Sequence, residues 1–217
     1  MYSGVIFDLD GTLIDTRNGI VESLEYTFKA LGLFFQKKHL LMKFVGPPIE
    51  ECFEIYFSFN QNDARRATEL FRDYYQENAL LKASPYPGIL PVLKLMQKKG
   101  TLLGVATNKR QDHALIILQH FCLESFFQSV KGSSSNSGQR KDYILRSCIE
   151  DLGLVPGRCL LIGDTAQDAK AAYTLGTAFI GATWGFGEFS ELESYPNLGL
   201  VNSTQELLEL LQRIELV

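Results

Sequence analysis

The chain has few of the residues that build disulfide-rich or thiolate-metal proteins. Its 217 residues include four cysteines, three histidines and one tryptophan. The cysteines are widely spaced, form no CxxC pair and do not combine with histidines at metal-ligand spacing, so neither a zinc site nor a disulfide framework is indicated. We expect reduced thiols, most of them in the core, and a cytoplasmic protein. The four cysteines are Cys52, Cys122, Cys148 and Cys159.

Long apolar runs and an excess of positive charge are also missing. The longest apolar runs are far shorter than the ~18 residues that a membrane-spanning helix requires, and the N-terminus shows no signal-peptide pattern. The formal net charge is -4, whereas nucleic acids and anionic membranes attract basic surfaces. We therefore expect no nucleic acid and no membrane as a partner. The composition leaves the oligomeric state unknown.

The residues that are present give the composition of an ordinary globular protein, with 46% hydrophobic and 21% charged residues. The length allows one large domain, or one domain with a smaller insertion. Apolar residues at helical spacing predict an amphipathic helix that ends near Gly32, and a further helical pattern covers residues 37–79 with a break at Gly46-Pro47-Pro48. These apolar positions are Ile20, Leu24, Phe28 and Leu31 in the first helix and Ala67, Leu70 and Tyr74 in the last.

The pattern changes after the punctuated segment Ser84-Pro85-Tyr86-Pro87-Gly88. From there on, helices and strands alternate, which predicts parallel βαβ units and therefore an α/β fold with a parallel sheet. The expected strands cover 101–106, 128–131, 158–162, 178–180 and 199–201, and the expected helices cover 89–98, 111–121, 142–152, 168–175 and 204–214.

Two carboxylates follow the first apolar run of the chain. Asp8 and Asp10 come at the end of the segment that begins Val5-Ile6-Phe7. If the segment is a buried strand, both side chains point to the same face, because side-chain direction repeats every second residue. Ligands of open α/β sheets bind at the carboxyl ends of the strands, and a pair of acids there suits a divalent cation and acid–base chemistry. The alternative is an edge turn with two solvated aspartates.

Polar residues of a kind suited to phosphate follow the strand expected over 101–106. Thr107-Asn108-Lys109 offers a hydroxyl, an amide and backbone N–H groups at a helix start, where an anion is well accommodated. Thr107 alone would serve equally well as a helix N-cap. Lys141 also lies at an expected helix start, where the macrodipole disfavours a cation unless both share an anion. An isolated lysine would otherwise be a solvated surface charge.

Another acidic pair follows the strand expected over 158–162. Gly163 allows a tight turn, and Asp164 and Asp168, one helical turn apart, can face a common ion. Helix capping explains one of these acids but not comfortably both. Four polar clusters near strand ends and helix starts are hard to explain as independent caps, and together they predict one site for an anion and a cation. The segment Trp184-Gly185-Phe186-Gly187 would either border this site or plug the core.

In combination these motifs resemble those of the haloacid dehalogenase superfamily, and within it the branch of phosphoglycolate phosphatase and related small-molecule phosphatases. The resemblance covers essentially the full length. It implies a Rossmann-like three-layer core with a parallel central sheet, formed by residues 1–15 and 83–217, and an inserted all-helical cap, residues 16–82. Dehalogenases usually lack an aspartate at the position of Asp10, so phosphoryl transfer is the activity implied. The resemblance is carried by Asp8-Leu9-Asp10-Gly11-Thr12, Thr107-Asn108, Lys141, Gly163-Asp164 and Asp168, with Val45-Gly46-Pro47-Pro48-Ile49-Glu50 resembling a cap loop.

The same resemblance implies a role for each motif residue. Asp8 would attack phosphorus to form an aspartyl-phosphate, and Asp10 would protonate the leaving alkoxide and then activate water. The implied substrate is a small-molecule phosphate monoester, and the implied cofactor is one Mg²⁺. The phosphoryl oxygens would be held by Thr107, Asn108 and Lys141. The Mg²⁺ would be held by the Asp8 carboxylate, the Asp10 main-chain carbonyl and Asp164, with Asp168 as a ligand or an outer support.

Other functions compete with this one. A sugar-phosphate mutase similar to β-phosphoglucomutase shares the core motifs, but the His-Arg cap motif of such mutases is not found, since His39 is followed by leucine. A 5'-nucleotidase of the same superfamily is a further alternative. A non-catalytic binding module is disfavoured because no acidic or phosphate-binding position is missing. The natural substrate, and the cap residues that select it, do not follow from the sequence.

Overall fold

The computed structural model describes residues 2–33, 38–45, 49–134 and 140–216. The chain forms two compact units, one made of Met1–Asp15 and Pro85–Val217 and the other of Thr16–Ser84. We call the first the sheet unit and the second the helical unit. The Gly46-Pro47-Pro48 break, which is half of the segment that resembles a cap loop, lies outside the described residues.

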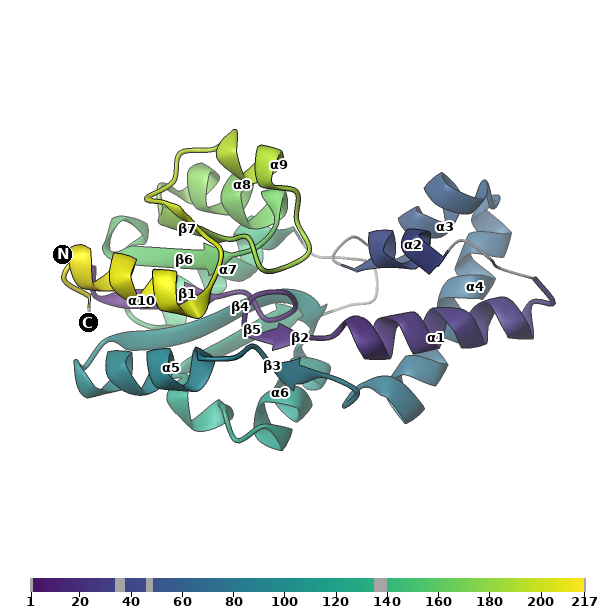
Figure 1. Cartoon of the computed structure of the whole chain (residues 1–217), viewed down its shortest axis with the longest axis horizontal. Helices are drawn as coiled ribbons and strands as arrows, with labels where there is room; N and C mark the ends of the chain where they lie inside the picture. Colours follow the sequence, from purple (N-terminus) through teal and green to yellow (C-terminus); the bar gives the residue numbers. More distant parts are fainter. Residues whose placement is uncertain (1, 34–37, 46–48, 135–139, 217) are drawn as a thin grey trace. The chain divides into compact units, whose positions relative to one another are not determined.

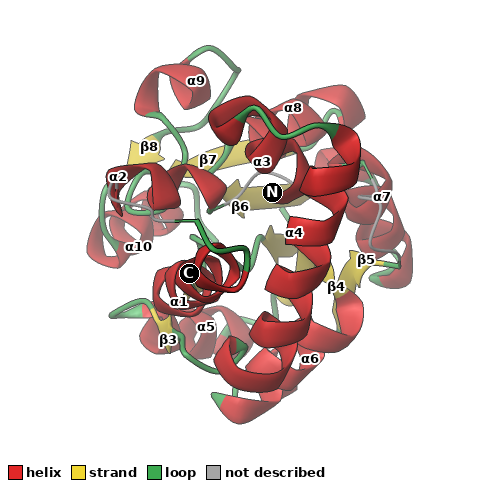
Figure 2. Cartoon of the chain, turned by 90° about the vertical axis from the view of Figure 1, so that its right-hand side faces the viewer, coloured by secondary structure: helices red, strands yellow, loops and turns green. Residues whose placement is uncertain are grey.

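The sheet unit is built on a six-stranded sheet in the order β5-β4-β1-β6-β7-β8, and every neighbouring pair is parallel. Figures 1 and 2 show helices α8 and α9 on one side of these strands and α5 and α6 on the other. The predicted α/β class with a parallel central sheet is therefore confirmed. The strands are β1 (Gly4–Phe7), β4 (Leu102–Arg110), β5 (Ser129–Ser133), β6 (Cys159–Gly163), β7 (Ala178–Ala182) and β8 (Leu200–Val201), and the helices are α5 (Ile89–Lys98), α6 (Gln111–His120), α7 (Lys141–Asp151), α8 (Ala166–Leu175), α9 (Phe189–Glu193) and α10 (Thr204–Arg213).

Strand β1 occupies the centre of the sheet and is buried along its whole length. Phe7 pairs with Val105 of β4 on one side and with Ile162 of β6 on the other. The chain moves outward from β1 in both directions, so the sheet order reverses beside this strand, and such a switch point is where doubly wound sheets bind ligands. The residues that follow β1, β4 and β6 are therefore brought to one edge of the sheet.

Side chains from alternating strand positions form the core between the sheet and helices α7 and α8. Ile6 and Leu161 pack there against Leu145 and Ile149 of α7 and Ala172 of α8. The predicted helix over 89–98 coincides with α5. The largest difference concerns β4, which runs to Arg110 where the prediction ended the strand at residue 106, because its pairing with β5 resumes beyond an irregular segment.

The helical unit is held together by aromatic side chains. Phe53 is fully buried, and its ring contacts those of Phe28, Phe44 and Phe59. Such ring pairs add to the free energy gained by burying apolar area. The unit begins after the short strand β2 (Ile14–Asp15), which pairs with β3 (Ser84–Pro85). Its described helices are α1 (Arg17–Ala30), α2 (Lys38–Leu41), α3 (Ile49–Phe57) and α4 (Gln61–Tyr74), with a 3-10 turn over Met42–Phe44 and a π-helical turn over Tyr75–Ala79.

The buried stripe of α4 differs in part from the one predicted. Ala67 is buried as expected, but Leu70 and Tyr74 are only half-buried, and the buried aromatic residues are Phe71 and Tyr75. The prediction was wrong because Tyr74 uses its hydroxyl at the surface, where it donates a hydrogen bond to Glu22. None of the helices in the described ranges is both long and apolar enough to cross a membrane.

Candidate active site

Asp8 is the first residue after β1, and it is almost completely buried. Its backbone N–H continues the sheet pattern by donating to the Ile162 carbonyl, 2.9 Å away. The strand itself ends at Phe7, so Asp10 lies in the turn that follows and not in the strand. The alternation argument that placed both acids on one face therefore does not apply to Asp10, and each acid has its own partner.

Asp164 follows β6, the neighbour of β1, and is fully buried. Its carboxylate accepts hydrogen bonds from the Thr12 hydroxyl at 2.9 Å and from the Phe186 backbone N–H at 2.8 Å. Gly11, with a φ of 88°, lies against this carboxylate, and a Cβ at residue 11 would overlap Asp164 Oδ2. Only a glycine can take this backbone conformation without strain and approach so closely. The turn after Asp8 and the loop after β7 thus hold Asp164 in place together.

Asp168 lies in the first turn of α8 and has two functions there. Its Oδ2 atom accepts hydrogen bonds from the Thr165 hydroxyl at 2.6 Å and the Thr165 backbone N–H at 3.1 Å, while Thr165 caps the helix in return. This reciprocal arrangement is a capping box. The other oxygen, Oδ1, faces the Lys141 ammonium at 2.7 Å. Capping therefore explains only one of the two oxygens.

Lys141 is the first residue of α7, and its side chain is buried with its ammonium between two carboxylates. The Nζ atom lies 2.5 Å from Asp8 Oδ1 and 2.7 Å from Asp168 Oδ1. Burial by itself disfavours the charged ammonium, but Asp168 and Asp8 outweigh it, so the pKa of Lys141 lies above its ordinary value. Lys141 is therefore charged, and it links strand β1 to helices α7 and α8.

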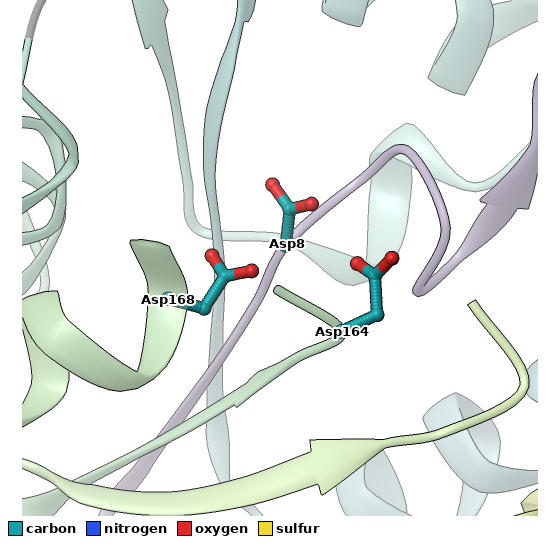
Figure 3. A group of neighbouring side chains, drawn as sticks. All are labelled: Asp8, Asp164 and Asp168. Carbon is teal, nitrogen blue, oxygen red and sulfur yellow. The ribbon is translucent and has the colours of Figure 1, made fainter. Parts of the chain in front are cut away.

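The carboxylates of Asp8, Asp164 and Asp168 form one cluster. They offer three oxygen atoms that all lie within 4.8 Å of one another. Figure 3 shows their carboxyl groups directed into a common space, from the loop after β1, the end of β6 and the start of α8. Burial raises the pKa of Asp8 to about 7 despite the opposing effect of Lys141, and burial, reinforced by Asp8 and Asp168, raises the pKa of Asp164 well above its usual range. Without a bound cation, ionisation of Asp8 and Asp164 is therefore less favourable than in water.

The charges of this cluster fit a divalent cation. Three buried carboxyl groups share this space with one ammonium, so their full ionisation would leave an excess of negative charge in a region from which water is nearly excluded. Uncompensated buried charge is costly, so it is normally paired or bound to metal. Carboxylate oxygens are the ligands that Mg²⁺ prefers, and Mg²⁺ needs few protein ligands because it keeps several waters. Asp8, Asp164 and Asp168 therefore provide a suitable set of donors.

Asp10 is not one of these three carboxylates, and it pairs with Lys109. Its Oδ2 atom accepts a hydrogen bond from Lys109 Nζ at 2.8 Å, and both side chains are largely buried. The Oδ1 atom of Asp10 is buried and has no hydrogen-bond donor among the described residues. Lys109 was not predicted as a site residue. The only signal for it was its place directly after Thr107-Asn108.

Thr107, Asn108 and Lys109 occupy an irregular segment of β4. The pairing of β4 with β5 shifts register between Ala106 and Arg110, and such irregularities redirect side chains near active sites. The Thr107 hydroxyl is buried and accepts the Lys109 backbone N–H at 3.2 Å. Asn108 Nδ2 donates to Gln167 Oε1 at 2.6 Å, which ties β4 to the start of α8.

The structure thus gathers part of the predicted set into direct contact. Lys141 contacts both Asp8 and Asp168, and the carboxylates of Asp8, Asp164 and Asp168 share one space. Thr107 and Asn108 lie on the adjacent strand β4. The roles assigned to all of them stay predictions.

The segment Trp184-Gly185-Phe186-Gly187 after β7 borders the site, which was one of the two predictions made for it. Besides the N–H that Phe186 gives to Asp164, Trp184 Nε1 donates to the Thr12 carbonyl at 3.2 Å. A Cβ on Gly185 or Gly187 would overlap Asp164. Glycines are the sequence signal of such a close backbone approach, because they have no Cβ.

Comparisons with known proteins agree with this geometry. The family described as haloacid dehalogenase-like hydrolase matches residues 5–182. A 5'-nucleotidase of Pseudomonas aeruginosa is 32% identical over 89% of this chain and 88% of its own length, and a phosphoglycolate phosphatase of Aquifex aeolicus is 32% identical over 84% and 85%. The crystal structure of a predicted phosphatase from Clostridium acetobutylicum superimposes with a TM-score of 0.88, at 33% identity and 99% coverage of both chains.

The fold and the site together define a class of protein. It is an α/β protein that carries a buried acidic site at the carboxyl ends of a parallel sheet, with the matched region extending from β1 to β7. The chain belongs to the haloacid dehalogenase-like hydrolases.

Proposed function

We propose that this hydrolase is a Mg²⁺-dependent phosphatase that cleaves a small-molecule phosphate monoester through an aspartyl-phosphate on Asp8. The observation that carries the proposal is the buried cluster of Asp8, Asp164 and Asp168, with the Lys141 ammonium between Asp8 and Asp168. A phosphoryl group requires positive charge on its oxygens and a nucleophile in line with the ester bond. Lys141 at the start of α7 would supply the positive charge, and Asp8 after β1 would supply the nucleophile.

The proposed reaction has two steps that share one proton carrier. In the first, an Asp8 oxygen forms a bond to phosphorus, the bond from phosphorus to the ester oxygen breaks, and Asp10 gives its proton to the leaving alkoxide. In the second, Asp10 takes a proton from water, the resulting hydroxide attacks phosphorus, and the bond to Asp8 breaks to release phosphate. Asp10 then carries its proton again. This is covalent catalysis assisted by a general acid and base.

The remaining residues would hold the phosphoryl group. Thr107, Asn108 and Lys141 would donate to its oxygens, and Lys141 would exchange a carboxylate contact for one to phosphate. When bound to Asp8, Asp164 and the Asp10 carbonyl, with Asp168 as ligand or outer support, Mg²⁺ would neutralise charge that develops on phosphate. General acid–base catalysis contributes about 10² to 10⁴ in rate, whereas phosphate monoester hydrolysis needs up to ~10²¹. The larger share must therefore come from positioning and charge stabilisation.

Phosphoglycolate and nucleoside 5'-monophosphates are the two substrate classes to test first. Each is supported by a relative that is 32% identical and has that activity in its name. The helical unit, Thr16–Ser84, is proposed as the cap that selects between them. A sugar-phosphate mutase has no comparable support among these relatives.

The proposal is tested by phosphate release with and without Mg²⁺ from phosphoglycolate, adenosine 5'-monophosphate and glucose 1-phosphate. We expect Mg²⁺-dependent release from at least one of them, and loss of turnover in Asp8→Asn with an unchanged far-UV spectrum. The amide has nearly the shape of the carboxylate but is a poor nucleophile. Near-normal turnover of Asp8→Asn would refute the role of Asp8, and an isomerised phosphosugar in place of free phosphate would show a mutase.

A further inference from the structure

The ion pair between Lys109 and Asp10 lies between two parts of the site. Lys109 follows Thr107 and Asn108 directly, and its backbone N–H donates to the Thr107 hydroxyl. Its ammonium extends to Asp10 in the turn after β1, 2.8 Å from Oδ2. One lysine thus connects the proposed phosphate-binding segment with the proposed acid and base.

The two oxygens of Asp10 differ in their surroundings. Oδ2 is held by Lys109, whereas Oδ1 is buried and receives no hydrogen bond from the residues that the structure describes. A buried polar atom without a partner costs free energy and calls for an explanation. Proton transfer between Oδ1 and a reacting oxygen would explain the unpartnered atom. Because Lys109 holds Oδ2, Oδ1 is the oxygen of Asp10 that is left to give or take the proton.

The burial of the pair favours a fixed geometry. The side chains of Lys109 and Asp10 are 8% and 19% exposed, respectively. An ion pair shielded to this extent is screened less by solvent than a surface pair such as Lys131–Asp151, whose side chains are 26% and 48% exposed. In addition, the Lys109 backbone N–H donates to the Thr107 hydroxyl, and the Gly11 backbone N–H, directly after Asp10, donates to the Ile14 carbonyl at 2.8 Å.

We propose that Lys109 is a positioning residue that fixes the Asp10 carboxyl group by its Oδ2 atom, so that Oδ1 faces the ester oxygen that leaves. This inference rests on the proposed phosphatase function. Lys109 then acts on the departure of the alcohol and not on the binding of phosphate. The loss of activity on substitution of Lys109 should therefore be larger for esters whose leaving group must be protonated.

The experiment compares leaving groups. The p-nitrophenolate leaving group departs readily without a proton, whereas the alkoxides of phosphoglycolate and adenosine 5'-monophosphate require one. We expect Lys109→Met to lower kcat/KM for the alkyl esters by a factor within the about 10² to 10⁴ of general acid catalysis, and to lower kcat/KM for p-nitrophenyl phosphate less than about 10-fold. The ratio kcat/KM is used because it reports the steps up to alcohol release.

Three further variants complete the test. Lys109→Arg keeps a donor to Oδ2 and should restore part of the activity on alkyl esters, while the surface control Lys131→Met should leave both ester classes unaffected. In an Asp10→Asn background, Lys109→Met should have no additional effect on alkyl esters, since the residue acts through Asp10. Thermal unfolding of each variant checks the fold, and Lys109→Gln replaces Lys109→Met if the latter does not fold.

Several results would overturn the inference. An equal loss on both ester classes would place Lys109 in phosphate binding or in folding, and no loss on either class would remove its role. Additive losses in the double variant would mean that Lys109 acts independently of Asp10. The proposed phosphatase function fails in a different way: the wild-type protein would release no phosphate from any of these esters in Mg²⁺, and the inference about Lys109 would fail with it.

Discussion

The two units of this chain differ in the kind of polar residue that they bury. In the sheet unit, the described residues include three buried aspartates and a buried lysine, all gathered at the carboxyl ends of β1 and β6 and the starts of α7 and α8. In the helical unit, the buried polar residues that the structure describes are Thr16, Ser23, Thr27 and Thr68. Ser23 and Thr27 bond back to carbonyls of their own helix, at Gly19 and Ser23.

This difference shows which part of the fold contains groups that lower its stability. Buried charges lower stability unless they are paired or bound to a cation, and the sheet unit concentrates them at one place. Among the described residues of the helical unit no charged side chain is buried, and its core contains packed aromatic rings. We therefore expect the sheet unit to be sensitive to substitutions of its buried charged residues, and the helical unit to substitutions of its buried aromatic residues.

The largest expected effect comes from Lys141→Ala. The substitution leaves Asp8 and Asp168 without their shared ammonium, and breaking a buried ion pair typically costs about 3–5 kcal/mol in the free energy of unfolding. Denaturant unfolding measures this loss. We also expect lower phosphatase activity and weaker inhibition by inorganic phosphate.

The control for Lys141→Ala is Lys131→Ala, which breaks the exposed pair with Asp151. It should change stability and activity little, because exposed ion pairs are screened by solvent. Unchanged phosphate inhibition in Lys141→Ala would mean that another cation holds the anion.

Phe53→Ala is expected to have a similar effect on stability but in the other unit. Phe53 is fully buried among rings of the helical unit, and such a truncation costs about 3–5 kcal/mol. Hydrogen exchange should become faster within Thr16–Ser84 and stay unchanged in the strands of the sheet unit. Ile55→Ala on the same helix is the control, since Ile55 is 69% exposed. Equal acceleration in β1 would contradict the separation of the two cores.

The smallest effect is expected at the exposed polar group of the helical unit. Lys82 and the Tyr74 hydroxyl both donate to Glu22, and these hydrogen bonds, that of Lys82 first, hold the pKa of Glu22 below its ordinary value. A lowered folded-state pKa stabilises the fold above the unfolded pKa and loses this effect as the pH falls through the folded value. The stability difference between wild type and Glu22→Gln should therefore narrow from pH 7 toward pH 3. A constant difference would show that the charge of Glu22 has no part in it.

The classes of the elements and the positions of the residues with catalytic chemistry could be predicted from the amino-acid sequence. The period of the apolar residues predicted the helical block and the alternation of helices and strands, because periodicity reflects which face of an element is buried. The polar residues after β1 and β6 followed from the same pattern, since a parallel sheet binds its ligands at the strand ends. Lys141 was found because a cation at a helix start is unusual.

Which of these residues contact one another depends on how the elements pack. Lys141 reaches Asp8 across 133 positions of the chain, and Lys109 reaches Asp10 across 99. No local pattern encodes such pairs, because they depend on the strand order and on the irregular end of β4. The hydrogen bond from the Phe186 backbone N–H to the Asp164 carboxylate depends in the same way on the path of the loop after β7. Residue spacing fixes direction along one element, whereas distance between elements is fixed by packing.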